Sequence, residues 1–357
     1  MKKIFKELHL WLSVPFGLIV FISCITGAIL EIEPMFDEPT HRDLFYVQDA
    51  NGEALPIAQL AQTVNESLDG EEINGLTVFN DPSRSYQFGL AKGRRTAMCI
   101  DQYSGEILGK YERPKFYTET VAMHRRLMGD SKSLGRKIIS YSTLALVIIL
   151  ISGLIVWLPK KAKHIGHMFA IHCSMGKKRF WLDMHSALGT YSLPLILLMC
   201  VTGLTWSFGW WRTGFFAVLG EEAPMRGSGG HGKKLDAENH QDVYLSWEQA
   251  LKQIQSQDKN YSEISFSNGS AKAKLGGWGN WRAADIYKFD KQGNITKIEP
   301  YEDQSRVVKI RDWIYTLHVG KWGGLFSEIL YLIVCLIGAS LPLTGYYLWI
   351  KRLWHKK

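Results

Sequence analysis

Four long apolar runs without charged residues constrain this chain more than any other feature of its sequence. They cover residues 8–30, 138–158, 184–211 and 329–350. Each run is long enough to cross the hydrocarbon core of a membrane, which needs roughly 20 helical residues. The mean hydropathy of -0.08 conceals them, because it averages the runs with long polar segments. The pattern excludes a soluble enzyme and predicts four membrane-spanning helices.

The positions of the basic residues predict how these helices are oriented. The N-terminal tail, residues 159–183 and the C-terminal tail are rich in lysine and arginine, and Glu7 and Asp183 are their only acidic residues. Short segments of this kind stay on the cytoplasmic side of a membrane. Both termini are therefore expected in the cytoplasm, and the two long segments in the periplasm of a bacterium. The net charge of +8 then reflects topology, and no nucleic-acid partner is expected.

The chain contains an internal duplication. One constant offset aligns the starts of the two halves without a gap, and a slightly different offset aligns the second and fourth spans. The matched positions are His9 with His185, Cys24 with Cys200, Thr26-Gly27 with Thr202-Gly203, His124 with His318, and Ser152-Gly153 with Thr344-Gly345. This predicts two parallel repeats about an axis along the membrane normal. Glycines at matched depths are interpreted as sites of close helix packing.

Each long external segment reads as a helix followed by strands. Helical spacing covers residues 57–68 and 245–257, and a hairpin turn with a glycine suited to positive φ follows at 101–106 and at 290–294. Residues 226–240 read as a mobile loop between the third span and the second external domain. The predicted fold class is a membrane protein of the α+β type, a four-helix bundle whose two repeats each carry a periplasmic α+β domain. The predicted parts are 1–30 (tail and first span), 31–123 (first external domain), 124–158 (rim segment and second span), 159–183 (basic loop), 184–211 (third span), 212–317 (second external domain) and 318–357 (fourth span and tail).

Several of these motifs resemble a known family. The hairpin "IDQYSGEILG" at residues 100–109 resembles the PepSY domain. The segments "MHRRLMGDSKSLG" at 123–135 and "RFWLDMHSALGTYSLPLILLMCVTGL" at 179–204 resemble the PepSY-associated transmembrane family. That family includes ferrisiderophore reductases, which are inner-membrane proteins of iron uptake that hold heme in the bundle. The resemblance implies the same location and cofactor for this chain.

The four matched histidines are the candidate cofactor ligands, because an imidazole at membrane depth is costly unless it has a partner. By topology, His9 and His185 lie near the cytoplasmic face, and His124 and His318 near the periplasmic face. A pair related by twofold symmetry can supply both axial nitrogens of one heme iron. We therefore expect two hemes b. The sequence has no C-x-x-C-H motif for covalent attachment. His172 is the reserve ligand.

Other side chains are expected around the periplasmic pair. His124 lies well before its apolar run, which begins at Ile138, so a helix break between Gly129 and Gly135 must return it to the rim of the bundle. Arg125 and Arg126 then suit heme propionates or an anionic substrate, although contact with the membrane surface explains them equally well. Trp210, Trp211 and Arg212 are candidates for substrate contact, with membrane-interface anchoring as the alternative.

The predicted function is a heme-containing reductase that moves electrons across the inner membrane to a periplasmic ferric siderophore. No catalytic residue is assigned, because outer-sphere electron transfer needs only close approach to the cofactor edge. The electron donor is unknown, and a quinol or a cytoplasmic reductase is expected because no nucleotide-binding motif is present. Membrane lipid is the other expected partner. The alternative function is a non-enzymatic sensor or inhibitor whose PepSY units bind peptide or protein.

Overall fold

The structure is a computed structural model that describes residues 2–92, 95–130, 132–159, 166–225, 240–257 and 260–354. Nearly all of the predicted loop 226–240 and part of the basic loop 159–183 lie outside these residues. The chain divides into two compact units. The bundle unit contains Met1–Glu33, Lys115–Ala223 and Ile314–Lys357, and the sheet unit contains Pro34–Pro114 and Pro224–Trp313.

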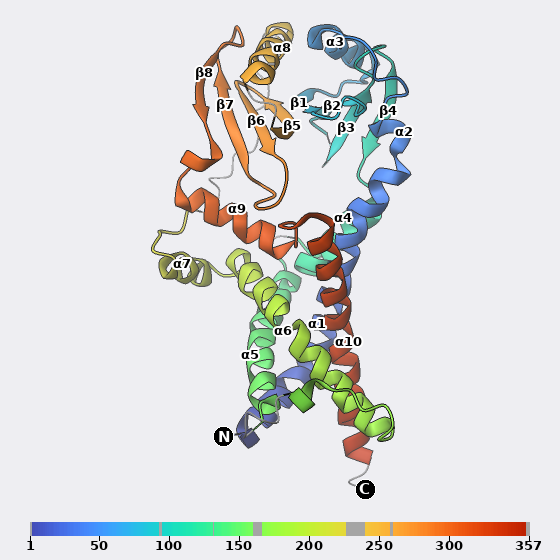
Figure 1. Ribbon diagram of the computed structural model, residues 1–357, viewed down its shortest axis with the longest axis vertical. Coiled ribbons are helices and arrows are strands. Elements are labelled where there is room, and N and C mark those ends of the chain that lie inside the picture. Colours follow the sequence, from blue (N-terminus) through green and yellow to red (C-terminus); the bar gives the residue numbers. More distant parts are fainter. Residues whose placement is uncertain are drawn as a thin grey trace. The chain divides into compact units, whose positions relative to one another are not determined.

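Four helices of the bundle unit are long and apolar enough to cross a membrane (Figure 1). They are α1 (Lys2–Thr40), α5 (Leu134–Trp157), α6 (Lys177–Ser207) and α10 (Gly324–Trp354). Each contains one of the predicted spans or most of it. The bundle is cross-linked by polar contacts as well as by apolar packing, since the Tyr346 hydroxyl on α10 donates to the Val14 carbonyl on α1 at 2.7 Å. The hydropathy pattern thus located the helices of a membrane protein.

The helix ends differ from the predicted span boundaries. The first span was expected to end at Leu30, but α1 continues to Thr40; α6 begins at Lys177, well before the expected start at Met184. The third span was expected to reach Trp211, whereas α6 ends at Ser207 and a separate helix α7 (Gly209–Val218) follows. Hydropathy marks only the apolar part of a helix. Its polar ends continue because their backbone hydrogen bonds are satisfied within the helix.

A sharp turn precedes the second long helix, as the sequence predicts. Helix α4 (Lys115–Arg126) ends just after His124, and Leu127 and Met128 have positive φ values of 48° and 67°. The Ser133 side chain then caps α5 by accepting from the Arg136 amide. A comparable turn joins α9 (Arg306–His318) to α10, with positive φ at Gly320 and Gly324. Both turns place a histidine at the end of a short helix that precedes a long one.

Gly135 is essential to the first of these turns. A Cβ atom built there would clash with the Arg126 carbonyl oxygen. We expect Gly135→Ala to lower the stability of the purified protein by about 1–3 kcal/mol through overpacking. Gly214→Ala in α7 is the control, since a Cβ there meets nothing within 4 Å; it should be neutral or slightly stabilising. Thermal unfolding in detergent measures both, and equal melting temperatures would refute this role of Gly135.

The sheet unit contains one antiparallel sheet of eight strands in the order β4-β3-β2-β1-β5-β6-β7-β8. The first half follows α2 (Arg42–Phe45) and α3 (Ile57–Ser67) and supplies β1 to β4; the second half follows α8 (His240–Gln257) and supplies β5 to β8. The strands are β1 (Ile73–Phe79), β2 (Tyr86–Leu90), β3 (Thr96–Ile100), β4 (Ile107–Glu112), β5 (Tyr261–Ser267), β6 (Ser270–Leu275), β7 (Ala284–Phe289) and β8 (Ile295–Glu299).

Strands β1 and β5 join the two halves at the centre of this sheet. Their register pairs Leu76 with Phe266 and Val78 with Ile264. Helices α3 and α8 contribute to the same buried apolar cluster, which includes Leu60 and the fully buried Trp247. The sequence analysis expected two separate external domains, 31–123 and 212–317. In the structure, residues 34–114 and 224–313 contribute the two halves of one sheet with one core, while Lys115–Ala223 belongs to the bundle unit. Backbone pairing between residues so far apart in sequence leaves no local signature.

The two predicted hairpin turns are confirmed. Gly105 between β3 and β4 has a φ of 75°, and Gly293 between β7 and β8 has a φ of 82°. Each half has four strands, whereas the sequence analysis located only the hairpin turn within the strand region. The strands before each hairpin turn are five to seven residues long, so each shows only a few repeats of the strand period.

Candidate functional site

The bundle unit brings the four matched histidines together as two facing pairs. The ring centroids of His9 and His185 are 6.4 Å apart, with an interplanar angle of 85°. Those of His124 and His318 are 6.5 Å apart, with an angle of 65°. His9 and His185, the first pair, come from α1 and α6; His124 and His318, the second pair, come from the ends of α4 and α9.

Each imidazole of the second pair is held from the Nδ1 side by a neighbouring long helix. His124 Nδ1 lies 3.0 Å from the Ser23 carbonyl and 3.0 Å from Thr26 Oγ1, both on α1. His318 Nδ1 lies 3.0 Å from the Met199 carbonyl and 3.1 Å from Thr202 Oγ1, both on α6. The two histidines thus have the same kinds of partner in corresponding places.

The first pair is held in a similar way by the other two long helices. His9 Nδ1 lies 2.9 Å from the Ile149 carbonyl and 3.4 Å from Ser152 Oγ, both on α5. His185 Nδ1 lies 2.8 Å from Thr344 Oγ1 on α10. That hydroxyl is within donating distance of the Ser340 and Leu341 carbonyls, at 3.1 and 3.0 Å, and can accept from the imidazole.

These contacts determine which ring nitrogen carries the proton. A carbonyl oxygen can only accept a hydrogen bond, so Nδ1 of His9, His124 and His318 must be the donor in each case. A neutral imidazole then keeps its free lone pair on Nε2. Within the part of the chain that the structure describes, no residue is hydrogen-bonded to Nε2 of any of the four histidines. Each pair therefore presents two nitrogens that are ready to bind a metal ion.

The four matched glycines lie against these imidazoles, and at Gly153 and Gly203 a side chain would crowd the ring. A Cβ atom built on Gly153 would lie 3.0 Å from His9 Cε1, and one on Gly203 would lie 3.1 Å from His318 Cε1. The corresponding distances are 3.6 Å for Gly27 to His124 and 3.5 Å for Gly345 to His185. The sequence interpretation of these glycines as helix-packing residues was incomplete. Each follows the Ser or Thr that lies near the same histidine, so the repeated Ser/Thr-Gly dipeptide was the signal for both roles.

The two pairs lie far apart along the bundle. On α1, Thr26 contacts the second pair and lies far beyond His9; on α6, Thr202 lies equally far beyond His185. At the rise of an α-helix these intervals correspond to about 25 Å.

Burial lowers the pKa of His318 to about 4, and the nearby His124 lowers it by a smaller amount. Burial also lowers the pKa of His124. Both rings of the second pair are therefore neutral at pH 7.

The remaining predicted residues near the histidines occupy different environments. Arg125 is exposed, whereas Arg126 is half-buried and its Nε is buried without a hydrogen-bond partner in the described structure. The reserve ligand His172 is engaged elsewhere, since its Nδ1 lies 2.8 Å from Asp183 Oδ2. Arg179 also contacts that carboxylate, at 2.9 Å. His172 is thus engaged with Asp183, whereas Arg126 Nε keeps its capacity to donate.

The aromatic candidates on α7 and its neighbour α6 also separate by role. Trp210 is 61% exposed, while Trp211 donates from Nε1 to the Val201 carbonyl at 3.0 Å and so anchors α7 to α6. Arg212 is half-buried, and its Nε has no partner among the described residues. Trp206 is a contact that the sequence analysis did not assign: its ring lies 5.0 Å from that of His318, edge to face. A single tryptophan at the end of a span is typical of a membrane-interface residue. The local sequence therefore gave no signal of the contact between Trp206 and His318.

The fold and the site define a membrane protein that has a bundle unit with four long apolar helices and two pairs of facing histidines, and a second unit built on an α+β sheet. A family model described as the PepSY-associated TM region matches residues 6–352. The chain belongs to this family. No curated protein matches the chain significantly.

Proposed function

We propose that the protein is a bis-heme, b-type reductase of the bacterial inner membrane that delivers electrons to a periplasmic ferric siderophore. The observation that carries this proposal is the geometry of the two histidine pairs. An iron between two imidazoles lies about 2 Å from each nitrogen, which puts the ring centroids about 6 Å apart. The centroid separations of 6.4 and 6.5 Å fit that arrangement at both sites.

The surroundings of the pairs also fit a heme. A heme held by these histidines would supply a one-electron carrier. His9 with His185, and His124 with His318, would hold the two irons through Nε2. The Ser, Thr and carbonyl partners at Nδ1 keep the rings oriented and raise their basicity. Near the second pair, the unpartnered Nε of Arg126 suits a propionate carboxylate.

The topology that we propose follows the charges of the short segments. Lysines 2, 3 and 6 precede the first apolar run, and Lys351 and Arg352 end the last long helix. Because such segments stay in the cytoplasm, the first pair belongs to the cytoplasmic side and the sheet unit to the periplasm. The bundle is then two parallel repeats, and its two histidine pairs form a path about 25 Å long across the membrane.

The chemistry at the end of this path needs no bond to the cofactor iron. The ferric ion of the chelate gains one electron, and its hard oxygen ligands then hold the resulting Fe(II) far less tightly. The electron comes from a quinol or a cytoplasmic reductase. The side chains of the rim, among them Arg125, Trp210 and Arg212, position the chelate. The ring of Trp206 contacts that of His318, with the centroids 5.0 Å apart.

The first test of the proposal is the colour of the purified protein. Protein produced with ample heme should be red, with a Soret band and a sharp α-band on reduction, and should contain two hemes per chain. A colourless and fully folded preparation would exclude the reductase and leave the alternative, a membrane-anchored PepSY unit that binds peptide or protein.

The partners of Nδ1 provide a second and finer test. Thr202→Val keeps the shape of the side chain but removes the hydroxyl that contacts His318. We expect the heme of the second pair to bind roughly 10-fold more weakly, because loss of such an outer-shell partner costs about 10-fold to 100-fold in metal affinity and the Met199 carbonyl remains. Thr190→Val on the same helix is the matched control, since that hydroxyl contacts only the Ser186 carbonyl. Heme titration of the apoprotein measures both variants, and identical affinities would contradict the assigned role of Thr202.

A further inference from the structure

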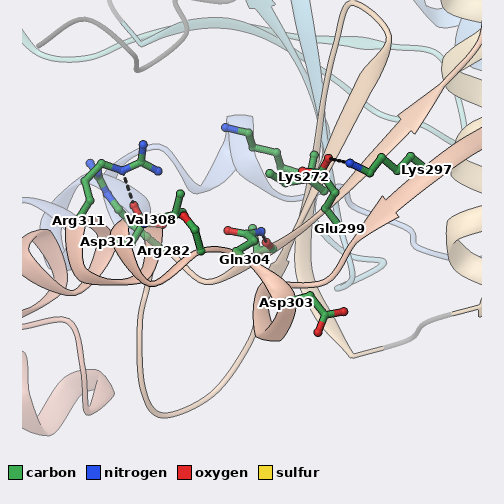
Figure 2. A pocket seen from close by; sticks show the side chains of 12 residues that line it. Lys272, Arg282, Lys297, Glu299, Asp303, Gln304, Val308, Arg311 and Asp312 are labelled. Carbon is green, nitrogen blue, oxygen red and sulfur yellow. Dashed lines mark hydrogen bonds and ion pairs between the residues drawn. The ribbon is translucent and has the colours of Figure 1, made fainter. Parts of the chain in front are cut away.

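A pocket of about 560 Å³ lies within the second half of the sheet unit (Figure 2). Its floor comes from β6, β7 and β8, and its wall comes from α9 and the residues just before it. The volume falls in the range of about 300–1,000 Å³ that is typical of small-molecule sites. Neither the histidine pairs nor the rim residues named above belong to it.

The strand period explains why this face of the sheet is polar. On β6, Ala271 and Ala273 point into the core shared with α8, so Lys272 between them points to the opposite face. On β7, Tyr287 is buried in that core, and Ile286 beside it lines the pocket. The pocket thus lies on the side of the sheet that faces away from α8.

The corresponding face of the first half is filled by the chain itself. Leu44 of α2 lies so close to Gly109 that a Cβ there would be 2.9 Å from the Leu44 side chain. Ser85 Oγ donates to the Leu44 carbonyl at 2.6 Å. Cys99 on β3, which alternates with the core residues Met98 and Ile100, is fully buried on this face. The two halves therefore differ: one face is packed, and the other contains a pocket lined by charged groups.

The pocket is lined by four basic and three acidic side chains, and the acidic ones already have basic partners or face away. Glu299 contacts Lys297 at 2.7 Å and Lys288 at 2.9 Å, and these hydrogen bonds lower its pKa to about 2. Asp312 accepts from Arg311 Nε at 3.2 Å. Asp303 is exposed, and Figure 2 shows its carboxylate directed away from the other labelled groups.

Two cations of the lining remain able to bind a ligand. The side chain of Lys272 has no hydrogen bond or ion pair with any described residue, and in Figure 2 it extends toward the side where Arg311 and Arg282 lie. Arg311 uses only Nε for Asp312, which leaves its terminal nitrogens as donors. Ala284, Ile286 and Val308 supply apolar surface between the charged groups. This combination suits an anionic ligand with flat apolar parts.

We propose that this pocket binds the ferric siderophore in its anionic, tris-catecholate class, with Lys272 and Arg311 contacting the catecholate oxygens and the apolar residues contacting the aromatic rings. The proposal rests on the proposed reductase function and specifies its substrate class. The pocket is a binding site of the sheet unit and is separate from the rim residues Arg125, Trp210 and Arg212, which are proposed to act at the electron-transfer step.

The test uses binding alone, so that it does not depend on electron transfer. The probe is the redox-inert Ga(III) complex of a tris-catecholate siderophore, and the comparison is the Ga(III) complex of a trihydroxamate, which is neutral. Titration calorimetry on the full-length protein in detergent should show preferential binding of the catecholate complex. Lys272→Glu should weaken that binding about 10-fold or more, because it replaces a charge-assisted hydrogen bond by repulsion.

Lys291→Glu is the matched control, since it makes the same charge change at an exposed turn that is not part of the pocket. Its affinity should equal that of the wild type. The proposal is overturned if neither complex binds, if the neutral complex binds as tightly as the anionic one, or if both variants weaken binding equally. A colourless protein that still binds the catecholate complex through Lys272 would refute the reductase and not the pocket. A red protein reoxidised by siderophores at the same rate in both variants would refute the pocket and not the reductase.

Discussion

Replacing His124 by alanine is expected to remove about half of the heme from the purified protein and to leave the spectrum of the remaining heme unchanged. His124 supplies one of the two nitrogens of the second pair, and a single imidazole holds the cofactor much less tightly. The first pair is held from α5 and α10, about 25 Å away along the bundle, so its geometry should persist. Heme content by the pyridine hemochrome assay, together with low-temperature spectra of the reduced α-band, measures the effect.

His172→Ala is the control for this experiment. His172 is engaged with Asp183, so its loss should leave both hemes in place. Equal loss of both spectral components in His124→Ala, or no loss, would show that the histidines are paired in another way. Loss of heme in the control variant would instead make His172 a ligand.

Ferric siderophores are expected to reoxidise the reduced protein only from the periplasmic face. In right-side-out vesicles, added chelate should oxidise dithionite-reduced heme rapidly, and in inside-out vesicles the same chelate should act slowly. The reason is that the sheet unit and the second pair are proposed to lie on the periplasmic side, while the membrane keeps a large polar chelate from crossing. Stopped-flow spectroscopy with several ferric siderophores, and with ferric citrate for comparison, measures the rates.

Substitutions at the rim should separate substrate binding from heme binding. Arg125 and Trp210 are both exposed, so Arg125→Gln and Trp210→Ala should raise the chelate concentration needed for half-maximal oxidation without bleaching the heme. Trp354→Ala, which alters an exposed tryptophan at the other end of the last span, is the control. If oxidation requires access to the cytoplasmic face, or if no siderophore reacts faster than ferric citrate, the protein is not a periplasm-facing ferrisiderophore reductase.

Much of the candidate site could be predicted from sequence, because its signals are local or repeated. Apolar runs identify the membrane spans independently of the tertiary fold. The duplication selects four histidines out of 11. The turn that returns His124 to the bundle was predicted from Gly129 and Gly135, and the structure shows it at Leu127 and Met128. The hydrogen-bond partners of those histidines were harder to predict from the sequence. The matched Ser/Thr-Gly dipeptides are visible in the sequence, but which histidine each one contacts depends on how the helices pack.

The sequence alone determined which segments are apolar helices, where the tight turns fall and which histidines correspond, since these properties depend on neighbouring residues or on the comparison of two copies. Only the tertiary structure decided that β1 pairs with β5 in one sheet, that the matched glycines lie against the imidazoles, and that Lys272 and Arg311 line one pocket. These relations join residues that are far apart in the chain. Backbone pairing, steric clearance and the shape of a pocket arise from three-dimensional proximity, and a local pattern of residues does not record them.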